Sequence, residues 1–236
     1  MRTKLLLIFI LIIVARPVFG QDEVFNLTAD EYLKLGVEYY DAGDPVIAIE
    51  TFREALRDTT YQDRATLHLF IGIAYLFPTD TIRTNDAINM ALWEFDTALG
   101  IDSGFAEAHY WKGKAKELIA DTVAAIEEYR TATKLNRKYA EAWNQWGVLL
   151  YSQGDYRGAS EKFKKAIFCE LKNPAYNATF HFNLYLAYYA RGWLSESADE
   201  MEKARKLNAN ITADSRVLMS RPMILKLKQL NGASKP

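Results

Sequence analysis

Residues 143–166 read WNQWGVLLYSQGDYRGASEKFKKA, and this stretch decides the fold of the chain. It has a large apolar residue directly before a glycine, a second glycine seven positions later, and then an aromatic residue with one alanine before it and one after it. The same landmarks recur at the same offsets near the N-terminus: Gly36, Gly43, Ala48, Phe52 and Ala55 there correspond to Gly147, Gly154, Ala159, Phe163 and Ala166 here. Self-similarity at constant spacing predicts a repeat protein.

The spacing resembles the tetratricopeptide repeat, a helix hairpin of about 34 residues. Three further copies depart from the pattern: one has a lengthened connection at 77–87, the next carries Lys112 and Lys116 where Leu and Tyr are usual, and the last has Tyr185 in place of a small residue. The resemblance implies an all-α, right-handed superhelical solenoid with a C-terminal capping helix. The expected repeats are 29–62, 65–105, 106–139, 140–173 and 178–211, between a linker at 21–28 and a capping helix with a basic tail at 212–236.

The repeated positions have a packing explanation. Small residues at positions 8, 20 and 27 of each copy let two helices approach to about 8–10 Å, and the aromatic residue at position 24 fills the space between them. Glycine at position 15 provides the left-handed turn that ends the first helix. Thr28 and Glu31 form a capping box that starts the first hairpin. Five copies exceed the minimum of about three that a stable stack needs.

Composition excludes several classes of protein. Among 236 residues, 29 Lys and Arg stand against 30 Asp and Glu, which argues against a basic nucleic-acid binder. The single cysteine, Cys169, excludes an internal disulfide framework and a cysteine-rich zinc site. It is expected to be a small buried hydrophobe rather than a reactive thiol. No phosphate-binding or dinucleotide-binding glycine motif is found in the sequence.

Three histidines invite a metal hypothesis. His68, His109 and His181 all fall at position 4 of their repeats, where Tyr32 and Trp143 stand in the other two. Equivalent positions in adjacent repeats are separated by the width of a hairpin, too far for ligands that must lie about 2 Å from one ion. The histidines are therefore expected to pack between helices in place of an aromatic side chain.

The resemblance implies that the first helices line a concave groove, into which positions 2, 5, 9 and 12 point. Chaperone-binding members of the family hold a terminal carboxylate with Lys and Asn at such positions, but Leu33, Val37 and Ile73 stand there in this chain. The alternative is that some of these apolar residues pack only against neighbouring helices. The candidate partner-binding residues are Tyr40, Tyr110, Lys114, Asn144, Tyr151, Phe182 and Tyr189.

Both ends of the chain differ from the repeats. Residues 1–20 have a basic start, an apolar run at 5–15 and small residues before Gln21, which predicts a cleaved signal peptide and a periplasmic or secreted protein. The run is shorter than the roughly 20 residues that span a bilayer. Residues 212–236 hold five basic residues against one acid, so the tail carries +4 and residues 21–211 carry −8. The tail is expected to cap the last repeat, and the alternative is that it docks on an anionic membrane.

We expect a non-enzymatic adaptor or assembly scaffold that binds a peptide or helix of another protein in its groove, with no cofactor and no nucleic acid. One alternative is an assembly factor of an envelope machine, similar to repeat-built pilotins, that contacts a membrane through the basic tail. Pilotins are typically lipoproteins, and this chain lacks the lipid-bearing cysteine. A less favoured alternative is a metal-dependent enzyme that uses His68, His109 and His181.

The mature protein is predicted to begin at or within a few residues of Gln21, because the apolar run is too short to span and a cleavage site follows it. Intact-mass analysis of protein from its native host tests this. A mass that includes Met1 contradicts the prediction.

Overall fold

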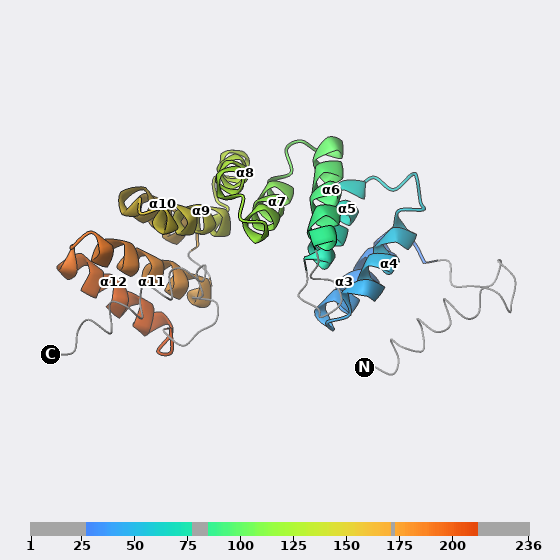
Figure 1. Cartoon of the computed structure of the whole chain (residues 1–236). Helices are drawn as coiled ribbons and strands as arrows, with labels where there is room; N and C mark the ends of the chain where they lie inside the picture. Colours follow the sequence, from blue (N-terminus) through green and yellow to red (C-terminus); the bar gives the residue numbers. More distant parts are fainter. Residues whose placement is uncertain (1–26, 77–84, 171–172, 212–236) are drawn as a thin grey trace, which may run out of the picture.

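The structure is a computed structural model that describes residues 27–76, 85–170 and 173–211, and these residues form helices and no strand. The helices form five consecutive hairpins that follow an arc (Figure 1). The all-α solenoid is thus confirmed. The expected signal peptide, the capping helix and the basic tail lie outside the described residues. The hairpins are α3 (Ala29–Asp41) with α4 (Pro45–Ala55), α5 (Arg64–Tyr75) with α6 (Asn85–Ile101), α7 (Ala106–Leu118) with α8 (Thr122–Leu135), α9 (Ala140–Ser152) with α10 (Tyr156–Cys169), and α11 (Pro174–Ala190) with α12 (Leu194–Leu207).

Four hairpins are closed by a glycine of the first helix that lies against an aromatic ring of the second. A Cβ atom added to Gly147 would lie 2.6 Å from the ring of Phe163, and one added to Gly113 would lie 2.7 Å from the ring of Tyr129. No side chain fits at those distances. The four rings, Phe52, Phe95, Tyr129 and Phe163, are fully buried.

The fifth hairpin replaces both partners of this contact. Tyr185 occupies the place of the glycine, and the flexible Met201 occupies the place of the ring. Both side chains are only partly buried, and they pack against a core cluster that includes Leu184 and Ala204. A large side chain on the first helix is accommodated because the facing side chain is unbranched and adaptable.

The turn between the two helices of a hairpin needs a left-handed residue. Gly43, Gly154 and Gly192 have φ values of +86°, +85° and +78°. The third hairpin has Ala120 at the same position, with φ of +59°. An L-residue with a Cβ atom is strained in this region by about 1–2 kcal/mol.

Side chains cap the starts of α3, α8, α10 and α11, and one of these starts differs from the expected repeat boundaries. The capping box of Thr28 and Glu31 is formed. Pro174 lies in the first turn of α11, and the side chain of Asn173 accepts hydrogen bonds from the backbone N–H groups of Ala175 and Tyr176. The repeat pattern predicts that the fifth repeat begins at Ala178. In the structure α11 begins at Pro174, so the four residues before Ala178 add one turn to the helix.

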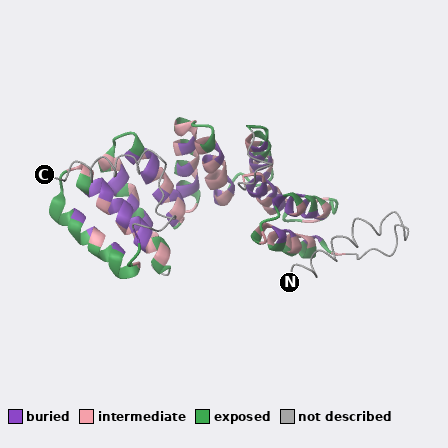
Figure 2. Cartoon of the chain, turned by 60° about the horizontal axis from the view of Figure 1, so that its bottom comes forward, coloured by how far each residue is buried: buried purple, intermediate pink, exposed green. Residues whose placement is uncertain are grey.

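The first helices line the inner side of the arc. α3 contacts α5, α5 contacts α7, and α9 contacts α11. Among the described residues, successive second helices do not contact one another as extensively as these first helices do. Elements on the inside of a curved stack lie closer together than those on the outside. Figure 2 shows the burial that results: α11 is mostly buried and the outer side of α12 is exposed. Of the helices that the structure describes, none combines the length and apolarity required to cross a bilayer.

We predict that Ala120→Gly raises the free energy of unfolding by about 0.5–1 kcal/mol, because relief of the left-handed strain exceeds the entropy that glycine adds to the unfolded chain. Urea denaturation followed by circular dichroism measures the change. Gly154→Ala is the matched control and should lower the stability by about 1 kcal/mol. An Ala120→Gly variant that is less stable than the parent contradicts the strain argument.

Candidate functional site

A cavity of about 310 Å³ opens on the inner side of the solenoid, across three consecutive first helices. α7, α9 and α11 all contribute to its wall, together with the loop before α9. A ligand here therefore contacts three hairpins at once. The lining residues are Tyr110, Trp111, Tyr139, Glu141, Asn144, Gln145, Tyr176, Thr179 and Phe180.

The polar centre of the cavity is Asn144. Its side chain is buried, and its Oδ1 accepts a hydrogen bond of 2.7 Å from Nδ2 of Asn183 on α11. This bond between buried amides holds the orientation of the Asn144 side chain and leaves its NH₂ group as a donor. An amide NH₂ group that is fixed in one orientation beside aromatic rings is suited to donate a hydrogen bond to a backbone carbonyl of a bound peptide.

Tyrosine rings form one wall of the cavity. The rings of Tyr110 and Tyr139 lie 5.0 Å apart between centroids. Burial, and then the nearby Glu141 and Glu117, raise the pKa of Tyr110 above its ordinary value. Burial likewise raises the pKa of Tyr139. Both phenols are therefore protonated at neutral pH and act as apolar walls with hydrogen-bonding tips, not as nucleophiles.

The structure brings only two of the seven predicted binding residues together at this cavity, Tyr110 and Asn144. Lys114, elsewhere on α7, lies 3.7 Å from a carboxylate oxygen of Glu117. Tyr40 is a partly buried member of the cores around α3 and α5. Tyr189 is 37% exposed and packs beside Tyr185.

Tyr151 and Phe182, two of the candidate partner-binding residues, are buried in the core of the last two hairpins. The ring of Tyr151 packs on Tyr156 at 4.9 Å, and the ring of Phe182 packs on Tyr185 at 5.5 Å. In this part of the arc the apolar residues of the first helices cover one another. These two residues stabilise the stack and offer little surface to a partner.

Tyr139, Gln145 and Tyr176 line the cavity but were not predicted, because they fall outside the four positions that face the groove in the repeat pattern. A signal for Tyr176 was available in the sequence: Asn173 followed by Pro174 is a typical helix start. It implies one more turn of α11 and places Tyr176 on a helix. The contribution of Tyr139 depends on how adjacent hairpins meet, which the pattern of a single repeat does not contain.

The three histidines do not form a metal site. Nδ1 of His68 lies 2.7 Å from Glu94, that of His109 lies 2.6 Å from Glu128, and that of His181 lies 2.5 Å from Glu200. Each pair joins the two helices of a single hairpin. In the part of the chain that the structure describes, no three His, Cys, Asp or Glu residues could hold an ion. The histidines lie between helices as expected, but each also pairs with a glutamate. In all three repeats this glutamate stands directly before position 24, so the sequence does contain a signal for the pairing.

The middle pair belongs to a larger network. Lys112 lies 2.9 Å from Glu128 and 2.8 Å from Asp96, so it connects the second hairpin to the third. Burial raises the pKa of Glu128, but the hydrogen bonds from His109 and Lys112 outweigh it and hold that pKa below its ordinary value. The network therefore stabilises the ionised carboxylate.

Cys169 is partly exposed, whereas the sequence predicted a small buried hydrophobe. Its Sγ donates a hydrogen bond of 3.3 Å to the carbonyl oxygen of Arg137. Burial raises the pKa of the thiol, which opposes the thiolate form that a nucleophile requires.

Comparison with known proteins supports the repeat architecture. The family model described as tetratricopeptide repeat matches residues 121–176. A TPR repeat-containing protein of Methanocaldococcus jannaschii is 32% identical over 128 residues, which cover 52% of this chain and 20% of that protein. The match thus spans a small part of this relative.

Solved structures share the fold. A crystal structure of MamA has a TM-score of 0.59 at 24% identity, with 76% of this chain and 97% of MamA covered. YrrB, described as a TPR protein with an unusual peptide-binding site, has a TM-score of 0.55 at 18% identity, with 85% of this chain and 92% of YrrB covered.

We predict that the stability contributed by Glu128 depends on pH. Its pKa is depressed in the folded chain, so the contribution is complete above the unfolded value of about 4.3 and is lost as the pH falls through the lower folded value. Glu128→Gln should lower the free energy of unfolding by about 1–2 kcal/mol at neutral pH and by progressively less below about pH 4.3. Urea midpoints between neutral and acidic pH measure the difference.

Glu50→Gln, at an exposed position of α4, is the control and should have little effect at any pH. A difference between Glu128→Gln and the parent that stays constant across this range argues against the ionic network.

Proposed function

We propose that this chain, which belongs to the tetratricopeptide repeat family, is a non-enzymatic interaction scaffold that binds a peptide or a helix of a partner protein on its inner face. The observation that carries the proposal is the cavity shared by α7, α9 and α11. Its walls are aromatic, and the Asn144 amide at its centre is fixed by a hydrogen bond from Asn183. The cavity also crosses two boundaries between hairpins. A segment of chain laid along the arc would contact all three helices.

The chemistry of the cavity favours a peptide. Tyr176 is 42% exposed at the cavity and offers a ring to an apolar side chain. Asn144 and Gln145 offer amide groups to peptide N–H and C=O groups. Aromatic rings beside polar side chains are typical of the residues that dominate the energy of protein interfaces. The description of YrrB as a peptide-binding TPR protein is consistent with this use of the fold.

The three histidines and Tyr110 are engaged in structural roles. The histidines are paired with glutamates, and the Tyr110 phenol is held protonated. We therefore propose a binding role with no chemical step. We also propose that the protein acts after export, in the periplasm or outside the cell, and this rests on the apolar run at 5–15 alone.

Site-specific photo-crosslinking in the native host tests the binding role. A p-benzoylphenylalanine in place of Tyr176 should capture a protein partner, whereas the same group in place of the exposed Val46 on α4 should not capture it. Capture of the same partner at equal yield from both positions, or from neither, contradicts the proposal.

With the captured partner purified, Gln145→Ala combined with Tyr176→Ala should weaken its binding by about 2–4 kcal/mol, the usual cost of truncating an interface anchor. Helix content should not change, since both side chains are partly exposed. Glu161→Ala on the second helix α10 is the control and should leave the affinity unaltered. Titration calorimetry measures all three proteins.

A further inference from the structure

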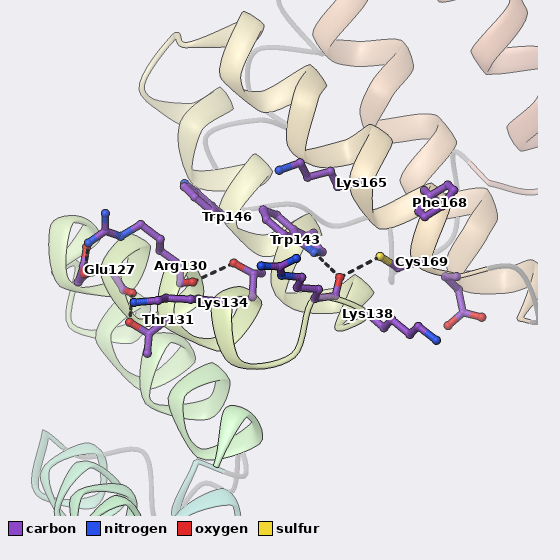
Figure 3. A pocket seen from close by; sticks show the side chains of 13 residues that line it. Glu127, Arg130, Thr131, Lys134, Lys138, Trp143, Trp146, Lys165, Phe168 and Cys169 are labelled. Atoms are coloured by element: carbon purple, nitrogen blue, oxygen red, sulfur yellow. Dashed lines mark hydrogen bonds and ion pairs between the residues drawn. The ribbon is translucent and has the colours of Figure 1, made fainter. Parts of the chain in front are cut away.

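A second and larger cleft lies on the other side of α9, between the second helices α8 and α10 (Figure 3). Its volume is about 1390 Å³, above the roughly 300–1,000 Å³ of pockets for small molecules. Trp143 and Trp146 of α9 line this cleft, while Asn144 and Gln145 of the same helix line the inner cavity. The two sites therefore share one helix and face opposite directions.

The base of the cleft is aromatic. The indole rings of Trp143 and Trp146 stack with 5.5 Å between centroids and 11° between planes. Nζ of Lys165 lies 4.3 Å from the centroid of the Trp143 ring, and Nζ of Lys162 lies 4.0 Å from that of the Trp146 ring. Beside them Phe168 projects from α10 with 80% of its surface exposed. This ring is therefore accessible to a ligand in the cleft.

The rim of the cleft is basic. Arg130 pairs with Glu127 at 2.5 Å, so those two charges balance. Four cations then stand against the single carboxylate of Glu170. Residues 21–211 carry a formal charge of −8, so this positive patch is local to the cleft and not a property of the whole body. The four cations are Lys134, Arg137, Lys138 and Lys165.

The loop that carries two of these cations is held in place. The backbone carbonyl oxygen of Arg137 accepts hydrogen bonds from the Trp143 indole N–H at 3.0 Å and from the Cys169 thiol at 3.3 Å. α9 and α10 thus both hold the backbone at Arg137, beside Lys138. A basic site that is already ordered loses less entropy when a ligand binds.

We propose that this cleft binds an acidic segment of a partner protein, with its carboxylates on Lys134, Arg137 and Lys138 and one apolar side chain against Phe168. Charge complementarity selects the acidic ligand, and the exposed ring selects the apolar anchor. This site is distinct from the proposed inner-face site and lets one scaffold hold two segments at once.

Two other anionic ligands fit less well. A single-stranded nucleic acid needs ring faces for successive bases, but Phe168 alone of the rings that line the cleft offers one, because the two indoles stack on each other and are covered by lysines. A bilayer surface is flat on this scale, whereas the indoles line a recess between α8 and α10 (Figure 3). A peptide segment can enter such a recess.

Fluorescence polarisation with three labelled hexapeptides tests the proposal. The first has two acidic residues on each side of Leu-Phe, the second has Gly-Ser in place of Leu-Phe, and the third has lysines in place of the acids. The first should bind most tightly, the second about tenfold more weakly, and the third without measurable affinity. An excess of the first peptide should also slow the alkylation of Cys169, which lies in the cleft.

Matched variants locate the binding on the chain. Lys134→Glu with Lys138→Glu should weaken the first peptide by at least about tenfold, whereas Lys34→Glu with Arg57→Glu, the same change of charge on the first hairpin, should have a far smaller effect. Phe168→Ser should weaken it by a similar factor, and Leu194→Ser, at another exposed apolar residue, should not. All four variants change exposed side chains, so circular dichroism should show unchanged helix content.

The proposal is overturned if the first peptide does not bind, if the charge variant in the cleft and its control weaken it equally, or if Cys169 is not protected. It is also overturned if a single-stranded oligothymidine or phosphatidylglycerol vesicles bind through Phe168 and displace the first peptide. The Gln145→Ala, Tyr176→Ala protein should bind the hexapeptide normally, which separates this result from the test of the inner face.

Discussion

The contact between a glycine of one helix and an aromatic ring of the next is the constraint on which the rest of this structure depends. At Gly36, Gly72, Gly113 and Gly147 there is no space for a Cβ atom beside the facing ring. The close approach sets the separation of the two helices in each hairpin and buries the ring completely. With that separation constant, equivalent side chains of successive hairpins take equivalent places, and a continuous inner face results.

The residues at a second pair of facing positions differ from hairpin to hairpin and give each hairpin its own surface. Position 4 of the first helix faces position 23 of the second. Three hairpins have a histidine there paired with a glutamate, which joins their helices by an ion pair or a hydrogen bond. The fourth has Trp143 with Lys162, and the indole and ammonium group meet as a cation–π contact at 5.7 Å. The replacement of histidine and glutamate by Trp143 and Lys162 in the fourth hairpin places an indole ring at the basic cleft.

The central helix α9 connects the two candidate sites. Residues three apart on a helix lie close to the same face, while those between them face the other way, so Trp143 and Trp146 line one site and Asn144 and Gln145 the other. The hydrogen bond from Asn183 and the one from Trp143 to the Arg137 carbonyl hold both faces in place. A scaffold with ordered sites on opposite sides of one helix is suited to bring two protein segments together.

The sequence by itself determined the architecture: the glycine and ring positions, the left-handed turns at Gly43, Gly154 and Gly192, and the capping box at Thr28 all follow from local sterics that the repeat pattern records. Tertiary structure alone decided which groove residues stay accessible. Tyr151 and Phe182 have the repeat positions of a binding residue, yet they are buried because the adjacent hairpins pack over them. The cleft between α8 and α10 was also outside the reach of the pattern. It depends on distances between helices, and a repeat register assigns each residue a face but not the side chain that it meets there.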